Sequence, residues 1–83
     1  MLKIFSVYDQ KARAFLPPFF LPERAMAERV FTDCVNSDDH QFGRHPEDYT
    51  LIEIGTFDDK DGLLLPKDIP DTIGTGLQYK SPE

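Results

Sequence analysis

Basic and aromatic side chains lie close together in the first third of the chain. Phe15, Phe19 and Phe20 fall between two groups of lysine and arginine residues. A cation can neutralise a phosphate while a ring stacks on a base, and sites for single-stranded nucleic acids combine the two. The pattern predicts a nucleic-acid site made of Lys11, Arg13, Phe15, Phe19, Phe20, Arg24 and Arg29. In the alternative interpretation, the three rings close the edge of the hydrophobic core.

The histidines are the second group that could do chemistry. His40 and His45 lie five residues apart, with acidic side chains before and after them. That spacing matches no zinc motif on a regular element, and no serine, cysteine or lysine lies in a recognisable nucleophile motif. Cys34 is the single cysteine, and its place in a helical pattern predicts a small buried hydrophobe. We therefore expect no catalytic residues, no metal, no cofactor and no small-molecule substrate, and the chain is not expected to be an enzyme.

An apolar segment rich in proline must position these side chains. Residues 15–22 read Phe-Leu-Pro-Pro-Phe-Phe-Leu-Pro. Proline forbids a helix interior and a central strand, so the segment is expected to be extended. Its apolar side chains must rest either on the core of the same chain or on the surface of a partner. The second case predicts a partner-binding segment made of Phe15, Leu16, Pro17, Pro18, Phe19 and Phe20.

Length and composition limit the architecture. The chain has 83 residues, of which 40% are hydrophobic, and a mean hydropathy of -0.42. These values predict one domain over residues 1–80 with a core of marginal size, a frayed tail at 81–83, and no membrane protein. The N-terminal sequence lacks the pattern of a signal peptide, so we expect a cytoplasmic location.

The charge limits the mode of binding. A net charge of -6 argues against a protein that coats nucleic acid with its whole surface, because that mode requires a positive field. The charge is uneven: residues 1–29 hold five basic and three acidic side chains, and most of the acidic residues follow. A local basic patch is compatible with this composition, although an acidic chain better fits a protein that binds other proteins.

The first half of the chain predicts one strand and one helix. Alternating apolar residues indicate a strand over residues 2–8, whose phase changes between Ile4 and Phe5. A helix is expected over residues 22–35, because proline suits a first helical turn and apolar residues recur at spacings of three and four. Its apolar stripe consists of Met26, Ala27, Val30, Phe31, Cys34 and Val35. A polar loop is expected over residues 40–48.

The second half predicts a hairpin. Residues 49–57 form the best strand pattern in the chain, and residues 58–62 are expected to turn, with Gly62 at a positive φ angle. The segments that follow are a partner strand over residues 63–65 that stops at Pro66, an irregular stretch over residues 67–71, and a weak edge strand or sheet cover over residues 72–79.

Together these elements predict an α+β fold. It consists of a small antiparallel or mixed sheet of three to four strands, with one helix on one face and an extended Pro/Phe-rich segment. One helix cannot cover both faces of the sheet. The second face needs the Phe-Pro segment, the C-terminal segment or a second copy of the chain as cover. We predict a homo-oligomer, most simply a two-fold homodimer.

Several motifs resemble a known viral family. They are the Val-Tyr-Asp that ends the first strand, residues 14–20 (Ala-Phe-Leu-Pro-Pro-Phe-Phe), residues 45–51 (His-Pro-Glu-Asp-Tyr-Thr-Leu) and residues 55–59 (Gly-Thr-Phe-Asp-Asp). Over residues 2–80 the chain resembles a family of small non-structural proteins of gokushoviruses, which are tailless microviruses with circular single-stranded DNA genomes. The resemblance implies a protein outside the mature virion, labelled DNA-binding or replication-associated, with no defined catalytic residues.

Two functions follow from the residues and from the resemblance. In the first, a phage protein acts in viral genome replication, or in the switch to single-stranded DNA synthesis and packaging, by binding single-stranded DNA or the replication complex in the host cell cytoplasm. In the second, an acidic adaptor binds a host or viral replication protein through the Phe-Pro segment, without direct DNA contact. The charge favours the second function. The resemblance favours the first, which is the function we predict.

Overall fold

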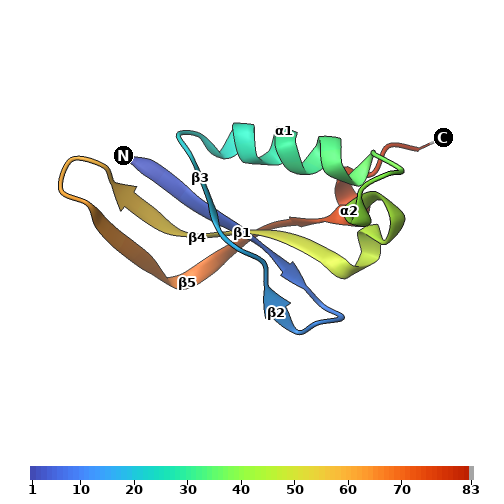
Figure 1. Cartoon of the computed structure of the whole chain (residues 1–83), viewed down its shortest axis with the longest axis horizontal. Helices are drawn as coiled ribbons and strands as arrows, with labels where there is room; N and C mark the ends of the chain where they lie inside the picture. The colour runs from blue at the N-terminus through green and yellow to red at the C-terminus, as the bar shows by residue number, and fades with distance from the viewer. Residues whose placement is uncertain (83) are drawn as a thin grey trace.

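The computed structural model describes residues 1–82 and shows a long sheet with helices on one side (Figure 1). In chain order the elements are β1 (Leu2–Asp9), β2 (Ala14–Phe15), β3 (Phe19–Leu21), α1 (Arg24–Val35), α2 (Gln41–Arg44), the 3-10 helix η1 (Pro46–Asp48), β4 (Tyr49–Asp58), β5 (Leu63–Thr75) and α3 (Gly76–Tyr79). None of the helices in this described part of the chain is long and apolar enough to cross a membrane.

The sheet is antiparallel throughout. Its strand order is β2-β1-β4-β5, and β3 also pairs with β1. The α+β class is therefore confirmed, with α1 on one face of the sheet. The sheet has five strands rather than three to four, because the two ends of the Pro/Phe-rich segment form short strands that the residue pattern did not reveal.

The Pro/Phe-rich segment is extended along the outer edge of β1, as expected. β2 and β3 occupy the two ends of that edge, and residues 16–18 interrupt the pairing between them. The Leu16 N–H donates to the Val7 carbonyl at 2.8 Å, and Ser6 Oγ donates to the Leu16 carbonyl at 2.7 Å. Prolines are tolerated here because an edge strand does not need every N–H group for the sheet.

The phase change in β1 coincides with a bulge in its neighbour. Ile4 pairs with Gly55 but Phe5 pairs with Glu53, so β4 contains one extra residue, Ile54. A bulge of this kind bends the strand and increases its twist. The apolar residues of β1 change faces at the same point, because Phe5 lies in the core under α1 whereas Ile4 points to the other face.

The hydrophobic core lies between α1 and the sheet. Ala27, Phe31 and Val35 form the buried face of the helix. Met26 and Val30 were expected in the same apolar stripe, but they are 44% and 47% exposed, so this part of the prediction is wrong. The predicted stripe is wider than the surface that the sheet offers, and its flank therefore stays uncovered.

The prediction of a polar loop over residues 40–48 is also wrong, because the segment folds into α2 and η1. Phe42 anchors it. The ring is buried, with its centroid 4.5 Å from that of Tyr49 and 5.7 Å from that of Phe31. His40 caps α2, since its Nδ1 accepts a hydrogen bond from the Phe42 N–H at 3.0 Å. One large apolar residue thus holds a segment that is otherwise polar.

Strand β5 continues through Pro66, where the sequence predicted its end. Proline is compatible with the strand because β5 is the last strand of the sheet. Pro66 lies opposite Gly55 and Asp71 lies opposite Glu53, so residues 67–70 face a single residue of β4 and break the regular pairing. The irregular stretch expected here is therefore present, but as a large bulge of four residues within one strand.

The C-terminal segment returns to the helix side of the sheet. Thr75 Oγ1 accepts a hydrogen bond from the Gln78 N–H, and the Gln78 side chain accepts one from the Thr75 N–H, which is a capping box that begins α3. Tyr79 then packs edge-on against Phe31, with ring centroids 5.7 Å apart. Residues 72–79 therefore combine both predicted roles, strand and cover.

The end of the chain is fastened to α1 and α2 by several hydrogen bonds. Lys80 Nζ donates to the carbonyls of Val35 at 3.1 Å and Gly43 at 3.4 Å. The Ser81 N–H donates to Asn36 Oδ1 at 2.7 Å. Glu83 lies outside the described residues. Fraying of residues 81–83 stays a prediction.

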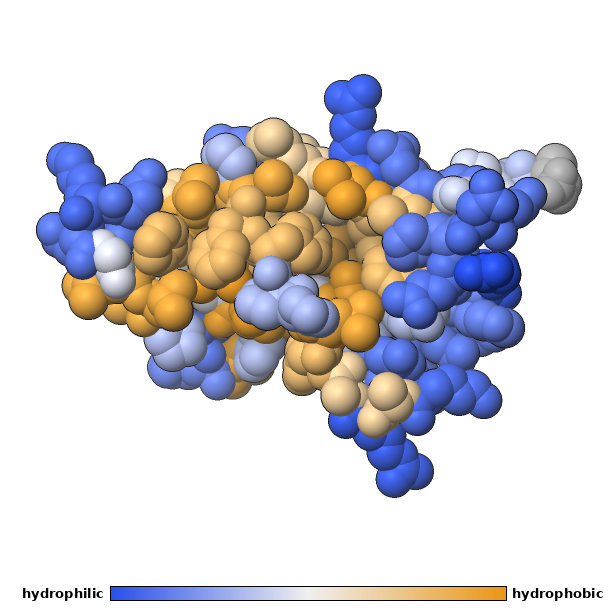
Figure 2. All heavy atoms as spheres, viewed as in Figure 1, coloured by the Kyte–Doolittle hydropathy of each residue, from blue (hydrophilic) through white to orange (hydrophobic). Residues whose placement is uncertain are grey.

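The face of the sheet opposite α1 carries no helix within residues 1–82. Paired residues of neighbouring strands point to the same face. The register therefore assigns to this open face the side chains of Tyr8, Phe15, Phe20, Ile52, Phe57 and Leu64. Figure 2 shows hydrophobic side chains gathered in a broad band across the middle of the molecule, with polar ones toward the ends. Ile4, Ser6 and Ile52 on this face are buried, whereas Phe15, Phe20 and Leu64 are exposed, so the face is covered only in part. The homo-oligomer stays a prediction.

Candidate nucleic-acid interface

The hairpin between β1 and β2 brings three of the predicted residues together. Asp9 closes its turn, because Asp9 Oδ1 accepts hydrogen bonds from the N–H groups of Lys11 at 3.0 Å and Ala12 at 3.2 Å. Arg13 follows with a φ angle of 56° and leads into Phe15 on β2. The side chains of Lys11, Arg13 and Phe15 are all exposed at this end of the sheet.

The ring of Phe15 is held in place but left accessible. Phe15 pairs with Tyr8 across the ladder, and the two rings meet edge to face with centroids 5.0 Å apart. Aromatic pairs favour this arrangement, which restricts the orientation of the ring. Phe15 nevertheless remains 50% exposed. Its ring can therefore stack on a planar group that approaches from solvent.

A second aromatic pair lies farther along the open face. Phe20 pairs with Ile4, and its ring meets that of Phe57 with centroids 5.6 Å apart. Phe20 is also exposed. Ile4 and Tyr8 are four residues apart along β1, which corresponds to about 13 Å. The open face thus presents two accessible rings in a line that begins at the basic hairpin.

Two predicted residues lie away from this surface. Phe19 points to the helix side, where its ring stacks on Phe5 with centroids 5.7 Å apart and packs against the core. For Phe19 this agrees with the alternative interpretation, in which the ring closes the core. Arg29 is exposed on α1, which covers the same side. The structure therefore places neither residue beside Lys11 and Arg13.

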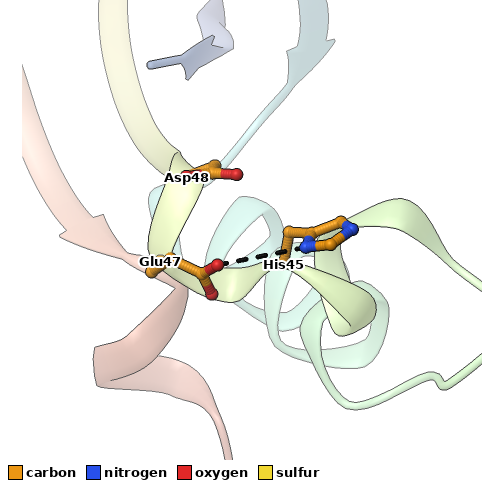
Figure 3. A group of neighbouring side chains, drawn as sticks. All are labelled: His45, Glu47 and Asp48. Carbon is orange, nitrogen blue, oxygen red and sulfur yellow. Dashed lines mark ion pairs between the residues drawn. The ribbon is translucent and has the colours of Figure 1, made fainter. Parts of the chain in front are cut away.

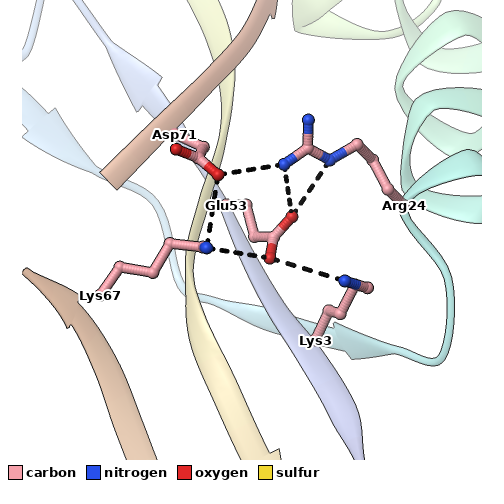
Figure 4. A network of polar contacts seen from close by, with 5 residues as sticks. All are labelled: Lys3, Arg24, Glu53, Lys67 and Asp71. Atoms are coloured by element: carbon pink, nitrogen blue, oxygen red, sulfur yellow. Dashed lines mark hydrogen bonds and ion pairs between the residues drawn. The ribbon is translucent and has the colours of Figure 1, made fainter. Parts of the chain in front are cut away.

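Arg24 belongs to a polar network between α1 and the sheet (Figure 4). Its Nε and one terminal nitrogen donate to Oε1 of Glu53 at 3.1 and 2.8 Å, and the terminal nitrogen also donates to Asp71 at 3.2 Å. Glu53 is only 2% exposed. Lys3 and Lys67 approach its other oxygen at 3.9 and 3.7 Å. A buried carboxylate requires such partners, because an unpaired buried charge is strongly destabilising.

The network shifts the pKa values of its more exposed members. The hydrogen bond and the charge of Lys67, followed by those of Arg24, hold the pKa of Asp71 below its ordinary value. The hydrogen bond to Glu53 raises the pKa of Arg24. The guanidinium of Arg24 is thus committed to carboxylates, and the basic side chains that accompany the exposed rings are those of the β1–β2 hairpin.

The sequence of the chain also matches a known family. Residues 2–79 match the model of the family described as Phage ORF5 protein. The chain belongs to this family. No curated protein and no solved structure gives a significant match. The phage part of the resemblance is therefore confirmed, whereas the gokushovirus assignment and the DNA-binding label stay predictions.

A second polar group of this ORF5-family chain lies at η1 (Figure 3). His45, Glu47 and Asp48 each bring one ligand atom within 4.8 Å of the others, and His45 Nδ1 lies 3.9 Å from Glu47 Oε2. His40 does not join them, because its ring caps α2. His45 and Glu47 are exposed, Asp48 is half-buried, and all three lie on one short turn, so they carry no argument for a metal centre.

Three residues of the interface and its support were not singled out from the sequence. Tyr8 contacts the ring of Phe15, and Phe57 contacts the ring of Phe20. These contacts depend on which residues of neighbouring strands are paired, and the residue pattern of a single strand does not show the pairing. Glu53 accepts hydrogen bonds from Arg24, and the sequence did contain an indication of this contact. A single acidic residue in the middle of the most apolar strand, residues 49–57, indicates a buried ion pair in this ORF5-family chain.

Proposed function

We propose that this phage protein acts in viral genome replication, or in the switch to single-stranded DNA synthesis and packaging, by binding single-stranded DNA. The contact surface is the β1–β2 hairpin together with the open face of the sheet. One observation carries the proposal: Lys11 and Arg13 lie on the same hairpin as Phe15, whose ring is held by Tyr8 and exposed to solvent. The proposal places the protein in the host cell cytoplasm and outside the mature virion.

The parts of this surface have separate roles. Lys11 and Arg13 neutralise phosphates of the bound strand, and the release of counterions makes the affinity depend on salt. Phe15 and, farther along the open face, Phe20 stack on bases. Each stacked base contributes about 1–3 kcal/mol in sites of this kind. Stacking needs unpaired bases, so single strands are preferred over duplex DNA.

The overall charge limits the affinity without excluding the contact. The net charge of -6 repels a polyanion at long range, but salt screens such repulsion beyond about 10 Å at 0.1 M ionic strength. Residues 9–13 carry two cations and one carboxylate, so the hairpin itself has a net positive charge. A small number of local contacts fits a protein that holds DNA briefly within a replication complex.

Fluorescence anisotropy with a labelled single-stranded oligonucleotide tests the proposal. We expect Lys11→Gln and Phe15→Ala each to weaken binding several-fold, and Lys11→Gln to reduce the salt dependence as well. Lys60→Gln is the matched control, because Lys60 has the same position in the β4–β5 turn, where Asp58 accepts the equivalent hydrogen bonds. Absence of binding at low salt, or an equal loss in the control, contradicts the proposal.

A second candidate function is the acidic adaptor that binds a host or viral replication protein. Two observations favour it. Pro17 and Pro18 are exposed in the middle of the Phe-Pro segment, and Met26 and Val30 of α1 are uncovered. Exposed apolar surface on a chain of net charge -6 suits a partner whose binding surface is basic at its rim. Met26→Glu should then abolish binding to that partner among purified replication proteins and leave the DNA anisotropy unchanged.

A further inference from the structure

The three leucines that begin β5 are exposed although they follow one another in a strand. Leu63, Leu64 and Leu65 are 53%, 62% and 45% exposed. Successive side chains of a strand point to opposite faces, and the register places Leu64 with Phe57 on the open face and the other two leucines on the helix side. A continuous apolar run is typical of a strand that is covered on both faces. Within residues 1–82, neither side of this segment is fully covered.

The same segment is the unprotected part of the sheet edges. Proteins block exposed edges with proline, lysine or bulges. The β2–β3 edge contains Pro17 and Pro18, and the later part of β5 contains Pro66, Pro70 and the four-residue bulge. Leu63–Leu65 carries none of these features. Its outer side therefore offers backbone groups to which another strand can bind.

The backbone of Leu64 faces this outer side. In an antiparallel ladder, alternate residues direct both of their backbone groups to the same neighbour. Pro66 is paired with Gly55 of β4 but has no N–H to donate to it. Pro66 therefore occupies a position at which the backbone groups of β5 point away from β4. Leu64 lies two residues earlier and shares that orientation. Two copies of Leu64 can therefore exchange a pair of hydrogen bonds across a two-fold axis.

The charges beside the leucines complement one another about the same point. Residues 60–68 read Lys-Asp-Gly-Leu-Leu-Leu-Pro-Lys-Asp. When two such segments run antiparallel with Leu64 opposite Leu64, the opposed charges are Lys60 with Asp68 and Asp61 with Lys67, each twice. In the described part of the chain, Lys60, Asp61 and Asp68 make no ion pair of their own. Lys67 already contacts Glu53 and Asp71, so the two Lys60–Asp68 pairs are the main source of the complementarity. A two-fold interface requires self-complementarity of this kind.

We propose that a second copy of this chain pairs with Leu63–Leu65 of β5, antiparallel and about a two-fold axis at Leu64, so that two sheets become one. An unrelated strand would also fit an open edge, but the symmetric order of charges favours the second copy. The β1–β2 hairpin lies at the end of the sheet opposite the β4–β5 turn (Figure 1). The dimer therefore leaves both basic hairpins free, and its existence does not depend on DNA binding.

Analytical ultracentrifugation over a micromolar concentration series tests the proposal. We expect a reversible dimer. Leu64→Glu sets two like charges opposite each other and should weaken the dimer at least about ten-fold. Leu77→Glu is the matched control, because Leu77 is 60% exposed but lies on α3. Circular dichroism checks that both variants are folded. A wild-type monomer at every concentration, or a dimer that Leu64→Glu leaves intact, overturns the proposal.

Two further variants test the register. Paired Cα atoms at such a position are about 5.5 Å apart, within disulfide range, so oxidation of Leu64→Cys should give a covalent dimer and oxidation of Leu77→Cys should not. Asp68→Lys should weaken the dimer several-fold, and Lys60→Asp in the same chain should restore it, because the pair then exchanges its signs. Equal cross-linking of the two cysteine variants, or no restoration, overturns the register.

Discussion

Arg13 and Gly62 occupy equivalent positions in two turns of the same design. Each residue follows an aspartate by four positions and has a positive φ angle, 56° for Arg13 and 71° for Gly62. In both turns the aspartate Oδ1 accepts hydrogen bonds from the N–H groups two and three residues later, at 3.0 and 3.2 Å. The charges differ, because residues 9–13 hold two cations and one carboxylate and residues 58–62 hold one cation and three carboxylates. The sheet thus carries a basic turn at one end and an acidic turn at the other.

Arg13→Gly is expected to stabilise the fold and to weaken DNA binding. A side chain in the left-handed region is strained, so glycine should raise the free energy of unfolding by about 0.5–1 kcal/mol. Loss of the cation should reduce the affinity for single-stranded DNA. Gly62→Ala, the converse change, should lower the free energy of unfolding by about 1 kcal/mol. Urea unfolding and anisotropy measure the two effects, and a destabilised Arg13→Gly protein would show that the turn does not strain this residue.

Arg24→Ala should destabilise the fold without reducing DNA binding. It removes the two shortest contacts of the buried Glu53 carboxylate. Because the guanidinium is partly exposed, we expect a loss of about 1–3 kcal/mol, below that of a fully buried pair. Arg29→Ala, on the exposed side of the same helix, is the control and should stay within about 0.5 kcal/mol of wild type. Weaker DNA binding by Arg24→Ala at unchanged stability would instead support the phosphate contact predicted from the sequence.

The sequence was sufficient for elements that local chemistry defines. The alternation of apolar and polar residues identified β1, and a glycine suited to a positive φ angle identified the turn that ends at Gly62. The structure confirms both predictions. Elements held by distant contacts were missed. Phe42 lies in a polar segment without helical periodicity, and its helix exists because the ring packs on Phe31 and Tyr49. Pro66 read as a strand end, because only the completed sheet shows that β5 is an edge.

The same division applies to the candidate site. Lys11, Arg13 and Phe15 are neighbours in the chain, so a hairpin was sufficient to bring them together. Arg24 contacts Glu53, which lies 29 residues away in the sequence. A residue pattern cannot show whether an arginine binds a phosphate or a carboxylate.

Acid should remove the contribution of Asp71 to stability. Its pKa lies below the ordinary value of 3.8, first because of Lys67 and then because of Arg24. The unfolded chain therefore takes up this proton before the folded chain does as the pH falls. The contribution is fully present above pH 3.8 and is lost as the pH falls through the lower, folded-state pKa.

Asp71→Asn tests this dependence. The variant should be less stable than wild type at neutral pH, and the difference should narrow below about pH 4. In a Lys67→Met background, Asp71→Asn should cost less stability at neutral pH, because Lys67 is the leading cause of the lowered pKa of Asp71. Urea unfolding in low salt, repeated at several acid pH values, measures the difference in free energy of unfolding between wild type and Asp71→Asn. A difference that stays constant through this range would mean that Asp71 acts through something other than its charge.

Phe42→Ala should destabilise the fold strongly, although its segment reads as a polar loop. The ring is buried against Phe31 and Tyr49, and removal of a buried phenylalanine ring costs about 3–5 kcal/mol. That is a large fraction of the total stability of a small domain. Phe15→Ala is the control, because its ring is half exposed, and Phe42→Leu should recover part of the loss by refilling the cavity. Chemical unfolding compares the three variants. Equal stabilities for Phe42→Ala and Phe15→Ala would mean that α2 does not contribute to the core.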